Sequence, residues 1–209
     1  MARKPKITNQ QILEAAREVF LQQGFGGSTV EIAQLAGISE ASIFKRFSTK
    51  EELFFAAMGL PERSLWMKEL ENLCGKGNLK ENLILVCLQI LEFYSEALPR
   101  FMMLRSRGSA LPEPGIRLEQ GPVQDVTVLT SFLEREISLN RLRSANAKIV
   151  AQILVGTLMN YVLLEQLPCS QAGLVTEAVR GIDSENPSTA VFSFIQSLVE
   201  TIWLGVAPI

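Results

Sequence analysis

Hydrophobic residues recur every three or four positions along most of this 209-residue chain, and no segment sustains the two-residue alternation of a half-buried strand. The first helical segment follows Thr8, whose spacing from Gln11 is that of a reciprocal capping box, and Gly24 can close it. One face of this helix is predicted to meet a core while the other meets water. The apolar stripe consists of Ile12, Ala15, Ala16, Val19 and Phe20.

Two shorter helices are predicted after Gly24. Ser28 and Glu31 have the spacing of a second capping box, and Gly37 can take the left-handed conformation that ends a helix. Ser39 can then cap the next helix at once. Helices joined by so tight a turn cross steeply, as in the helix-turn-helix unit that lays its second helix in the major groove of DNA. Such a unit also occurs as a purely structural corner, and that alternative stays open.

The second of these helices carries the candidate DNA contacts and is expected to end in the run Phe44-Lys45-Arg46-Phe47. Ile43 and Phe47 are one turn apart and should pack inward, which turns the intervening positions toward the groove. Lysines are expected on phosphates, whereas base edges, including a cytosine amine accepted by Glu40, would carry specificity. The Ser28 hydroxyl is a further candidate for a phosphate. The predicted DNA-binding residues are Ser28, Ser39, Glu40, Ala41, Ser42, Phe44, Lys45 and Lys50.

A fourth helix is predicted to begin beside the motif, because Thr49 and Glu52 form a third capping box. Gly59 and Pro61 should break or kink this helix, since proline removes a backbone donor and disfavours helical geometry at Leu60. The Gly59-Leu60-Pro61 turn is either a hinge or a simple change of chain direction.

At this point the chain resembles the TetR family of bacterial transcriptional regulators. The resemblance implies an N-terminal three-helix head, at residues 1–50, and an all-helical body for effector binding and dimerisation, at residues 51–209. It also implies that the fourth helix carries the signal between them. Two departures stand out: Phe44 replaces the usual tyrosine, and a shorter loop before Ser28 places polar Thr29 at a helix start that is commonly apolar. The matching residues are Gly24-Phe25, Glu31-Ile32-Ala33, Ala36-Gly37-Ile38-Ser39, Ser42-Ile43-Phe44, Phe47 and Lys50-Glu51-Glu52-Leu53.

The pattern beyond residue 51 is helical throughout, so the predicted fold is all-α. Further helices are expected at Leu79–Ala97, Pro99–Arg107, Pro122–Leu139, Ala145–Gln166 and Pro187–Val206. The last two are apolar on more than one face, which indicates burial against a second subunit. The predicted dimer interface consists of Ile149, Ile153, Gly156, Met159, Val191, Phe194, Ile195, Leu198 and Ile202.

A membrane span is the competing interpretation of these apolar helices. Gln152, Asn160 and the flanking charges Lys148 and Glu165 leave fewer than the ~20 apolar residues that a span needs. A homodimer is therefore expected, and its two-fold axis predicts a palindromic operator with half-sites roughly 34–36 Å apart.

Aromatic and methionine residues on the central helices suit a pocket for a small apolar or aromatic effector. Residues of this kind at helical spacing are also ordinary core residues, so both interpretations stand. The candidate effector residues are Trp66, Phe93, Tyr94, Phe101, Met102, Met103, Phe132 and Tyr161.

The composition of the chain limits the kinds of binding site and catalytic site that it can form. The net charge of −2 argues against bulk, nonspecific nucleic-acid binding, although residues 1–58 hold seven Lys and Arg against six Asp and Glu. With no histidine and three scattered cysteines, Cys74, Cys87 and Cys169, a zinc finger or a disulfide framework is not expected. No nucleophile–histidine pair or phosphate-binding glycine loop occurs, and Glu134 and Glu136 are interpreted as surface charges. No catalytic residue, metal site or cofactor is predicted.

The sequence therefore predicts a ligand-responsive, homodimeric DNA-binding regulator, a repressor released from its operator by a small molecule. No signal peptide is recognised at the N-terminus, so a cytoplasmic protein is expected. The alternative is a helical small-molecule binding or sequestering protein whose helix-turn-helix is structural.

Overall fold

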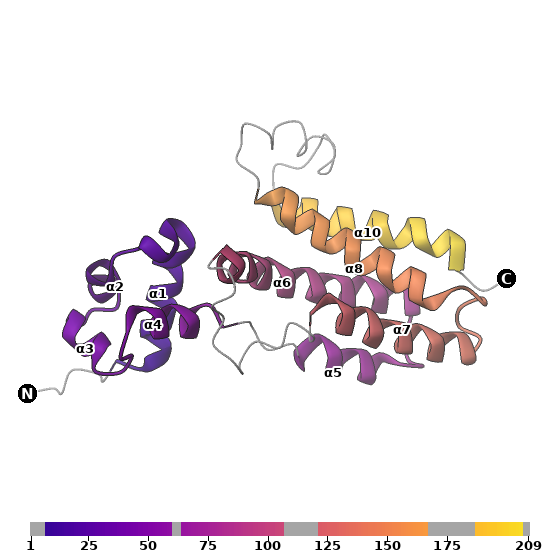
Figure 1. Cartoon of the computed structure of the whole chain (residues 1–209). Coiled ribbons are helices and arrows are strands. Elements are labelled where there is room, and N and C mark those ends of the chain that lie inside the picture. Colours follow the sequence, from indigo (N-terminus) through magenta and orange to yellow (C-terminus); the bar gives the residue numbers. More distant parts are fainter. Residues whose placement is uncertain (1–6, 60–63, 107–120, 167–186, 207–209) are drawn as a thin grey trace, which may run out of the picture. The chain divides into compact units, whose positions relative to one another are not determined.

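The computed structural model describes residues 7–59, 64–106, 121–166 and 187–206, and within these ranges every regular element is helical (Figure 1). The all-α prediction is confirmed. The helices are α1 (Asn9–Gln23), α2 (Thr29–Leu35), α3 (Glu40–Phe44), α4 (Lys50–Ala57), α5 (Ser64–Leu73), α6 (Leu79–Ser106), α7 (Pro122–Ser138), α8 (Ala147–Glu165) and α10 (Pro187–Val206), with a short 3-10 turn, η1, at Gly24–Gly26.

The chain divides into two compact units, and the division differs from the boundary expected at residue 50. The first unit comprises Met1–Leu60 and Pro99–Ile116; the second comprises Pro61–Leu98 and Arg117–Ile209. We call the first unit the head and the second the body. Helix α6 therefore has residues in both, and α4 belongs to the head.

In the head, α1 packs against α2 and α4 around an aromatic centre. Phe20 and Phe54 meet edge to face with ring centroids 5.2 Å apart, and Phe25 meets Phe54 in the same way. Edge-to-face pairs of this kind add stabilisation beyond the buried area. Leu104, from the last turns of α6, is 1% exposed and belongs to the same core.

Several of the predicted caps are present. The Gln11 backbone N–H donates to Thr8 Oγ1 at 3.2 Å, and the Thr8 N–H donates to Gln11 Oε1 at 2.9 Å, which completes the reciprocal capping box. Gly24 and Gly37 have φ values of 69° and 68°, the left-handed region expected where helices end.

Two predicted capping boxes form differently. Ser28 is the N-cap of α2, but its hydroxyl makes no capping hydrogen bond, and Glu31 instead accepts a hydrogen bond from Gln23 Nε2 at 2.8 Å. At α4, Thr49 Oγ1 accepts from the Glu52 N–H as predicted, while the Glu52 carboxylate accepts from the Ser48 N–H, one residue before the cap. Sequence spacing alone does not fix which nearby donor a flexible Glu side chain reaches.

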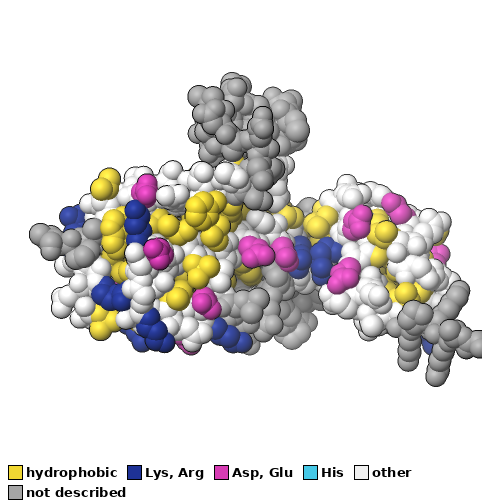
Figure 2. All heavy atoms as spheres, turned by 180° about the vertical axis from the view of Figure 1, so that it is seen from behind, with side chains coloured by type: hydrophobic (Ala, Val, Ile, Leu, Met, Phe, Trp, Pro, Cys, Tyr) yellow, Lys and Arg dark blue, Asp and Glu magenta, His cyan; other side chains and the backbone are white. Residues whose placement is uncertain are grey.

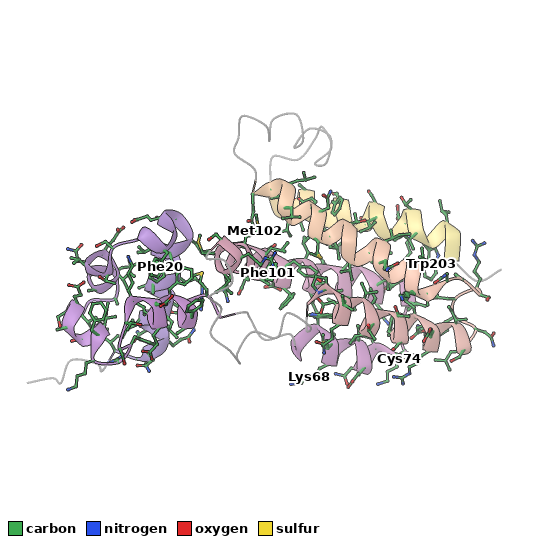
Figure 3. The ribbon with its side chains drawn as sticks, in the orientation of Figure 1. Phe20, Lys68, Cys74, Phe101, Met102 and Trp203 are labelled. Carbon is green, nitrogen blue, oxygen red and sulfur yellow. The ribbon has the colours of Figure 1, made fainter. Side chains whose placement is uncertain are left out.

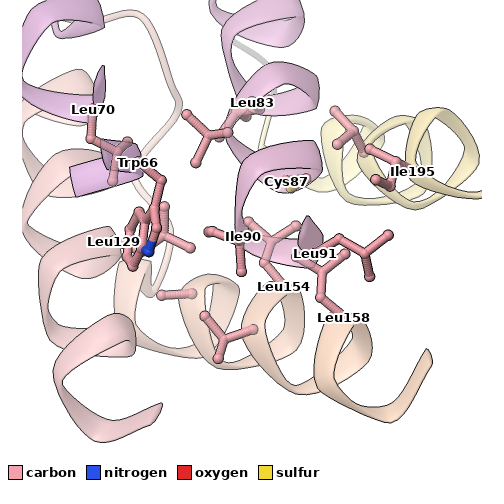
Figure 4. Packing of buried hydrophobic residues seen from close by; sticks show 14 of the residues in the cluster. Trp66, Leu70, Leu83, Cys87, Ile90, Leu91, Leu129, Leu154, Leu158 and Ile195 are labelled. Carbon is pink, nitrogen blue, oxygen red and sulfur yellow. The ribbon is translucent and has the colours of Figure 1, made fainter. Parts of the chain in front are cut away.

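In the body, α7 and α8 make the most extensive helix pair, and α5 lies beside α7. Figure 4 shows Trp66 of α5 next to Leu129 of α7, with Ile90 of α6 and Leu154 of α8 facing the same core. Helix α5 was not predicted as a separate element, although Trp66, Leu70 and Leu73 have helical spacing.

The expected break at Pro99 does not occur, because α6 runs unbroken from Leu79 to Ser106 with Pro99 inside it. A proline inside a helix removes one backbone hydrogen bond, and α6 continues through Pro99 despite this cost. Just after it, Arg100 is only 7% exposed and its Nη1 donates to the Gly59 carbonyl of the head at 3.0 Å. Leu60 and Pro61 lie outside the described residues, so the hinge at this turn stays a prediction.

Glu136 is the main error in the predicted surface charges. It is fully buried, its Oε2 lies 2.7 Å from Arg141 Nε, and its Oε1 accepts from the Gly75 N–H at 2.6 Å. The Arg141 guanidinium also donates to the carbonyls of Lys76 and Gly77. This group, which we call the Glu136 clasp, ties the end of α7 to the loop between α5 and α6.

Three described helices are long and apolar enough, by length and composition, to cross a membrane: Leu79–Ser106, Ala147–Glu165 and Thr189–Val206. Figure 2 shows hydrophobic side chains at the surface of the body. Large apolar residues of α8 and α10 are exposed, among them Ile149, Ile153 and Phe192. The composition argument made from the sequence is therefore weaker than expected for these helices.

Candidate nucleic-acid interface

Helix α3 is held at its start by its N-cap. Ser39 Oγ accepts from the Ser42 N–H at 3.3 Å and lies 2.8 Å from Ser42 Oγ. The inward positions are as predicted, with Ile43 0% and Phe47 7% exposed. The helix ends at Phe44, earlier than expected, and Lys45 is its C-cap. The short helix is thus anchored by Ile43, and Phe47 is buried three residues after its end.

The outward positions include most of the predicted DNA contacts. Ala41, Phe44 and Lys45 are exposed, and Ser42 is half-buried beside Ser39. Phe44 is 38% exposed even though it is a large apolar residue. An aromatic ring kept at the surface beside a lysine provides an apolar contact and a charge on one face.

Glu40, the first residue of α3, has a partner that the sequence did not reveal. Thr29 Oγ1, at the first residue of α2, donates to Glu40 Oε1 at 2.5 Å. The two helix starts are therefore joined by a side-chain hydrogen bond across the helix-turn-helix. Thr29 is the polar residue at a helix start that is commonly apolar in the family. That departure indicated an unusual residue, but it did not indicate Glu40 as its partner.

Two cations of the motif and its flank, Lys50 and Arg46, have local partners. Lys50 Nζ lies 5.1 Å from the centroid of the Phe25 ring, within the range of a cation–π contact. Arg46 Nη1 donates to Asn9 Oδ1 at 3.2 Å, which connects the end of the motif to α1. Arg46 was not among the predicted contacts, although it lies in the same basic run as Lys45. Ser28 is exposed, and its hydroxyl is not engaged as a helix cap.

The predicted effector residues separate into two groups. Five are buried in the body core: Trp66, Phe93, Tyr94, Phe132 and Tyr161. Phe101, Met102 and Met103 lie on the last turns of α6, within the head unit. Figure 3 labels the first two of them. Met102 is 51% exposed and Met103 packs against the head core. The eight residues are thus divided between the two units.

Polar groups are present within the body core. Tyr94 Oη donates to the fully buried Asp125 at 2.5 Å. Trp66 is 2% exposed, and its indole Nε1 has no hydrogen-bond partner among the described residues. Sequence periodicity identified the two aromatic residues but not Asp125, which α7 places on its inner face.

The part of the chain that the structure describes contains no group of three or more His, Cys, Asp or Glu side chains able to hold a metal ion. Cys74 and Cys87 are free thiols. Burial raises the pKa of the Cys87 thiol from 9.0 to about 12, because the thiolate would lose its hydration. Cys169 lies outside the described residues.

Helix α8 presents an open apolar stripe. Ile149 is 49% and Ile153 47% exposed, and Gly156 is exposed as well, while Met159 is half-buried. On α10, Val191, Phe194, Leu198 and Ile202 are half-buried. Ile195 is a correction: it is fully buried in the core of its own chain and is not available to a second subunit.

Comparison with known proteins assigns the N-terminal region. Residues 12–57 match the sequence model of the bacterial regulatory proteins of the tetR family. The chain is 43% identical over 54 residues to the transcriptional repressor AcnR of Corynebacterium efficiens, covering 25% of this chain and 29% of that protein. It is 38% identical over 76 residues to the transcriptional regulator AcrR of Shigella flexneri, covering 34% and 35%. The matched stretches thus span about a third or less of these relatives.

Solved structures extend the likeness to the fold of the whole chain. A transcriptional regulator from Rhodococcus sp. Rha1 has a TM-score of 0.59 at 20% identity and covers 97% of this chain and 100% of its own. The regulator FadR of Bacillus subtilis, solved with stearoyl-CoA, has a TM-score of 0.57 at 18% identity and covers 93% and 97%. Residues 12–57 thus carry the sequence pattern of the tetR family of bacterial regulatory proteins, and the solved structures show a similar fold for the whole chain.

Proposed function

We propose that this protein is a homodimeric DNA-binding transcriptional repressor whose affinity for a palindromic operator falls when a small apolar or aromatic effector binds the body. The observation that carries the proposal is the outward face of α3, where Ala41, Phe44 and Lys45 are exposed above the buried Ile43. A structural corner needs the buried residue and the caps, but it does not need an exposed phenylalanine beside a lysine.

The predicted contacts divide by chemistry. Lys45, Lys50 and the hydroxyl of Ser28 suit phosphates, which fix the register of a protein on the duplex. Ser39, Ser42, Ala41 and Phe44 suit the groove, where Phe44 meets a thymine methyl or a sugar because its ring offers no hydroxyl.

Dimerisation is supported by the open stripe on α8. Its exposed residues Ile149, Ile153, Gly156, Asn160 and Leu163 follow alternating spacings of four and three, the repeat of a helix that pairs with another helix. Gly156 allows close approach of two backbones. The half-buried residues of α10 supply a second helix, so that two subunits form a four-helix contact.

The same exposed faces argue for pairing in water and against a lipid environment. The outer side of α10 carries Ser193, Gln196, Ser197, Glu200 and Thr201, all exposed. Placing such groups in hydrocarbon costs free energy that a partner subunit or water avoids. We therefore propose that the protein acts in the cytoplasm.

Regulation has a structural route in α6. This helix begins in the body and ends with Leu104 in the head core, and Arg100 holds the Gly59 carbonyl at the end of α4. An effector that selects one position of α6 also selects one arrangement of residues in the head, which is the two-state coupling that allostery requires. FadR, which was solved with an acyl-CoA, supports an apolar effector class.

The test is selection of random duplexes by the purified protein at physiological salt, repeated with Phe44→Ala. An enriched palindrome that the variant no longer selects is the expected result. A specific dimer should prefer it over random DNA by roughly a thousandfold or more. Binding without any sequence enrichment would contradict the proposal and favour the alternative, a small-molecule binding protein with a structural helix-turn-helix.

A further inference from the structure

We infer that Glu40 is a specificity-determining residue that accepts a hydrogen bond from a cytosine amine in each half-site, and that Thr29 is the residue that positions it. The inference rests on the proposed DNA-binding function and goes beyond it by naming one base pair and the residue that reads it.

The first step is the place of Glu40. It is the first residue of α3, and residues at the start of a recognition helix are the ones that meet base edges in the major groove. Glu40 is half-buried, so its side chain is restricted without being withdrawn from the surface.

The second step is orientation. Thr29 Oγ1 holds Glu40 Oε1 at 2.5 Å, and Thr29 is itself half-buried at the first residue of α2. No Lys or Arg forms an ion pair with Glu40 among the described residues. One carboxylate oxygen is therefore committed to the protein, and the second keeps its capacity to accept.

The third step is the choice of partner. Phosphates repel a carboxylate, so a carboxylate at a DNA surface weakens binding unless a hydrogen-bond donor of the DNA meets it. Base pairs present two donors in the major groove, the amines of cytosine and adenine. The adenine amine stands beside the N7 acceptor, which repels a carboxylate and suits an amide. Cytosine is the matching base for an acceptor-only side chain.

The fourth step explains why the hydrogen bond with Thr29 matters. A free glutamate has several rotamers and loses that freedom on binding. The hydroxyl of Thr29 removes much of this cost before DNA arrives. With an apolar residue at position 29, Glu40 would still be the first residue of α3, but no hydrogen bond from residue 29 would fix its carboxylate.

The experiment is selection of random duplexes by the full-length protein and its variants, with competition measurements on the selected site. For the wild type we expect one position in each half-site to require C·G, with a loss of about tenfold when it is replaced by T·A. Glu40→Gln should shift the preference at that position toward A·T, because an amide pairs with both N6 and N7 of adenine. Glu40→Ala should accept any base pair there.

Thr29 is tested by two variants. Thr29→Val, similar in shape but without the hydroxyl, should keep cytosine as the preferred base with a smaller ratio over the other bases. Thr29→Ser, which retains a donor, should restore the ratio. Glu18→Gln, an exposed acid of α1, is the matched control and should leave the selected sequence unchanged. Circular dichroism melts of all variants confirm that each is folded.

The outcomes separate the two proposals. An unchanged consensus for Glu40→Gln, alongside a wild-type palindrome, would overturn the role of Glu40 and leave the regulator intact. Equal ratios for the wild type and Thr29→Val would overturn the positioning role of Thr29. Absence of any palindrome with the wild type would overturn both proposals together.

Discussion

At the scale of one residue, Lys45 tests the electrostatic part of the proposed DNA binding. Its side chain is exposed at the end of α3, and we propose that it meets a phosphate. Lys45→Ala should weaken binding to specific and random duplexes by a similar factor. The slope of log affinity against log salt concentration should fall by about one per subunit, or about two for a dimer.

The measurement is a salt titration by fluorescence anisotropy. Lys68→Ala, which removes an exposed lysine from α5 in the body (Figure 3), is the control and should leave the slope unchanged. A loss confined to the specific duplex would show instead that Lys45 reads a base.

Cys87 gives a second prediction at this scale. Its pKa is raised to about 12 by burial, so the unfolded thiol ionises at a lower pH than the folded one. Its contribution to stability is complete below pH 9 and is lost as pH rises from 9 toward 12. At pH 10 the unfolded state gains about 1.4 kcal/mol from this ionisation.

The free energy of unfolding of wild type and Cys87→Ala, measured in urea at pH 7 and pH 10, checks this loss. The difference in free energy of unfolding between the wild type and Cys87→Ala should narrow at pH 10, because the variant has no thiol to ionise at this position. A thiol reagent at pH 8 should modify the half-buried Cys74 while the protein is folded and Cys87 only after unfolding. A gap that stays constant with pH would contradict the assignment.

At the scale of single elements, the caps and stripes of the head were largely predictable because they depend on neighbours in sequence. Thr8 with Gln11, Ser39 with Ser42, and the buried Ile43 all follow from spacings of three or four. The Thr29–Glu40 hydrogen bond was not predictable in this way, since it joins side chains eleven positions apart. Only the crossing of α2 and α3 brings them together.

The Glu136 clasp shows the same limit in the body. Glu136 was predicted as a surface charge although it lies three residues after the buried Leu133, because Gly75 and Arg141 have no recognisable link to it in sequence. A carboxylate can be buried there because a backbone N–H and a guanidinium meet it.

Glu136→Ala should therefore lower the free energy of unfolding by about 3 kcal/mol, because it leaves the half-buried Arg141 without its anion. Glu136→Gln should cost less, since an amide oxygen still accepts from the Gly75 N–H. Urea denaturation followed by circular dichroism measures both. Glu134→Ala, two residues earlier and exposed, should change stability by less than about 0.5 kcal/mol. Equal effects at positions 134 and 136 would argue against the clasp.

At the scale of the whole molecule, the proposed dimer is tested through Ile153, which is 47% exposed in the middle of the α8 stripe. Ile153→Lys places two charges against each other across a two-fold axis and should convert the dimer to monomer. Analytical ultracentrifugation reports the mass. Operator affinity should fall by at least a hundredfold, because a monomer binds one half-site whereas a dimer binds two.

Ser131→Lys, on the exposed face of α7, is the control and should remain dimeric. A monomeric wild type would contradict the proposed interface directly, and a dimeric Ile153→Lys variant would show that the interface does not involve α8.

The general helical architecture was predictable from periodicity, but the pairing of subunits depends on which apolar residues remain exposed on the folded chain. Ile195 illustrates this, because it is buried in the core of its own chain and cannot contact a second subunit.

Leu104 in the head core has a practical consequence for building hybrids of this protein. A graft that joins the first sixty residues to a foreign body would leave an unfilled hole where Leu104 belongs and a bare carbonyl at Gly59 where Arg100 donates. The head, which we propose reads DNA, is therefore not a unit that can be transferred by a single cut in the sequence. A hybrid designed to keep the proposed operator preference has to include Pro99–Ser106 as well, so two separate stretches of the gene must be transferred together.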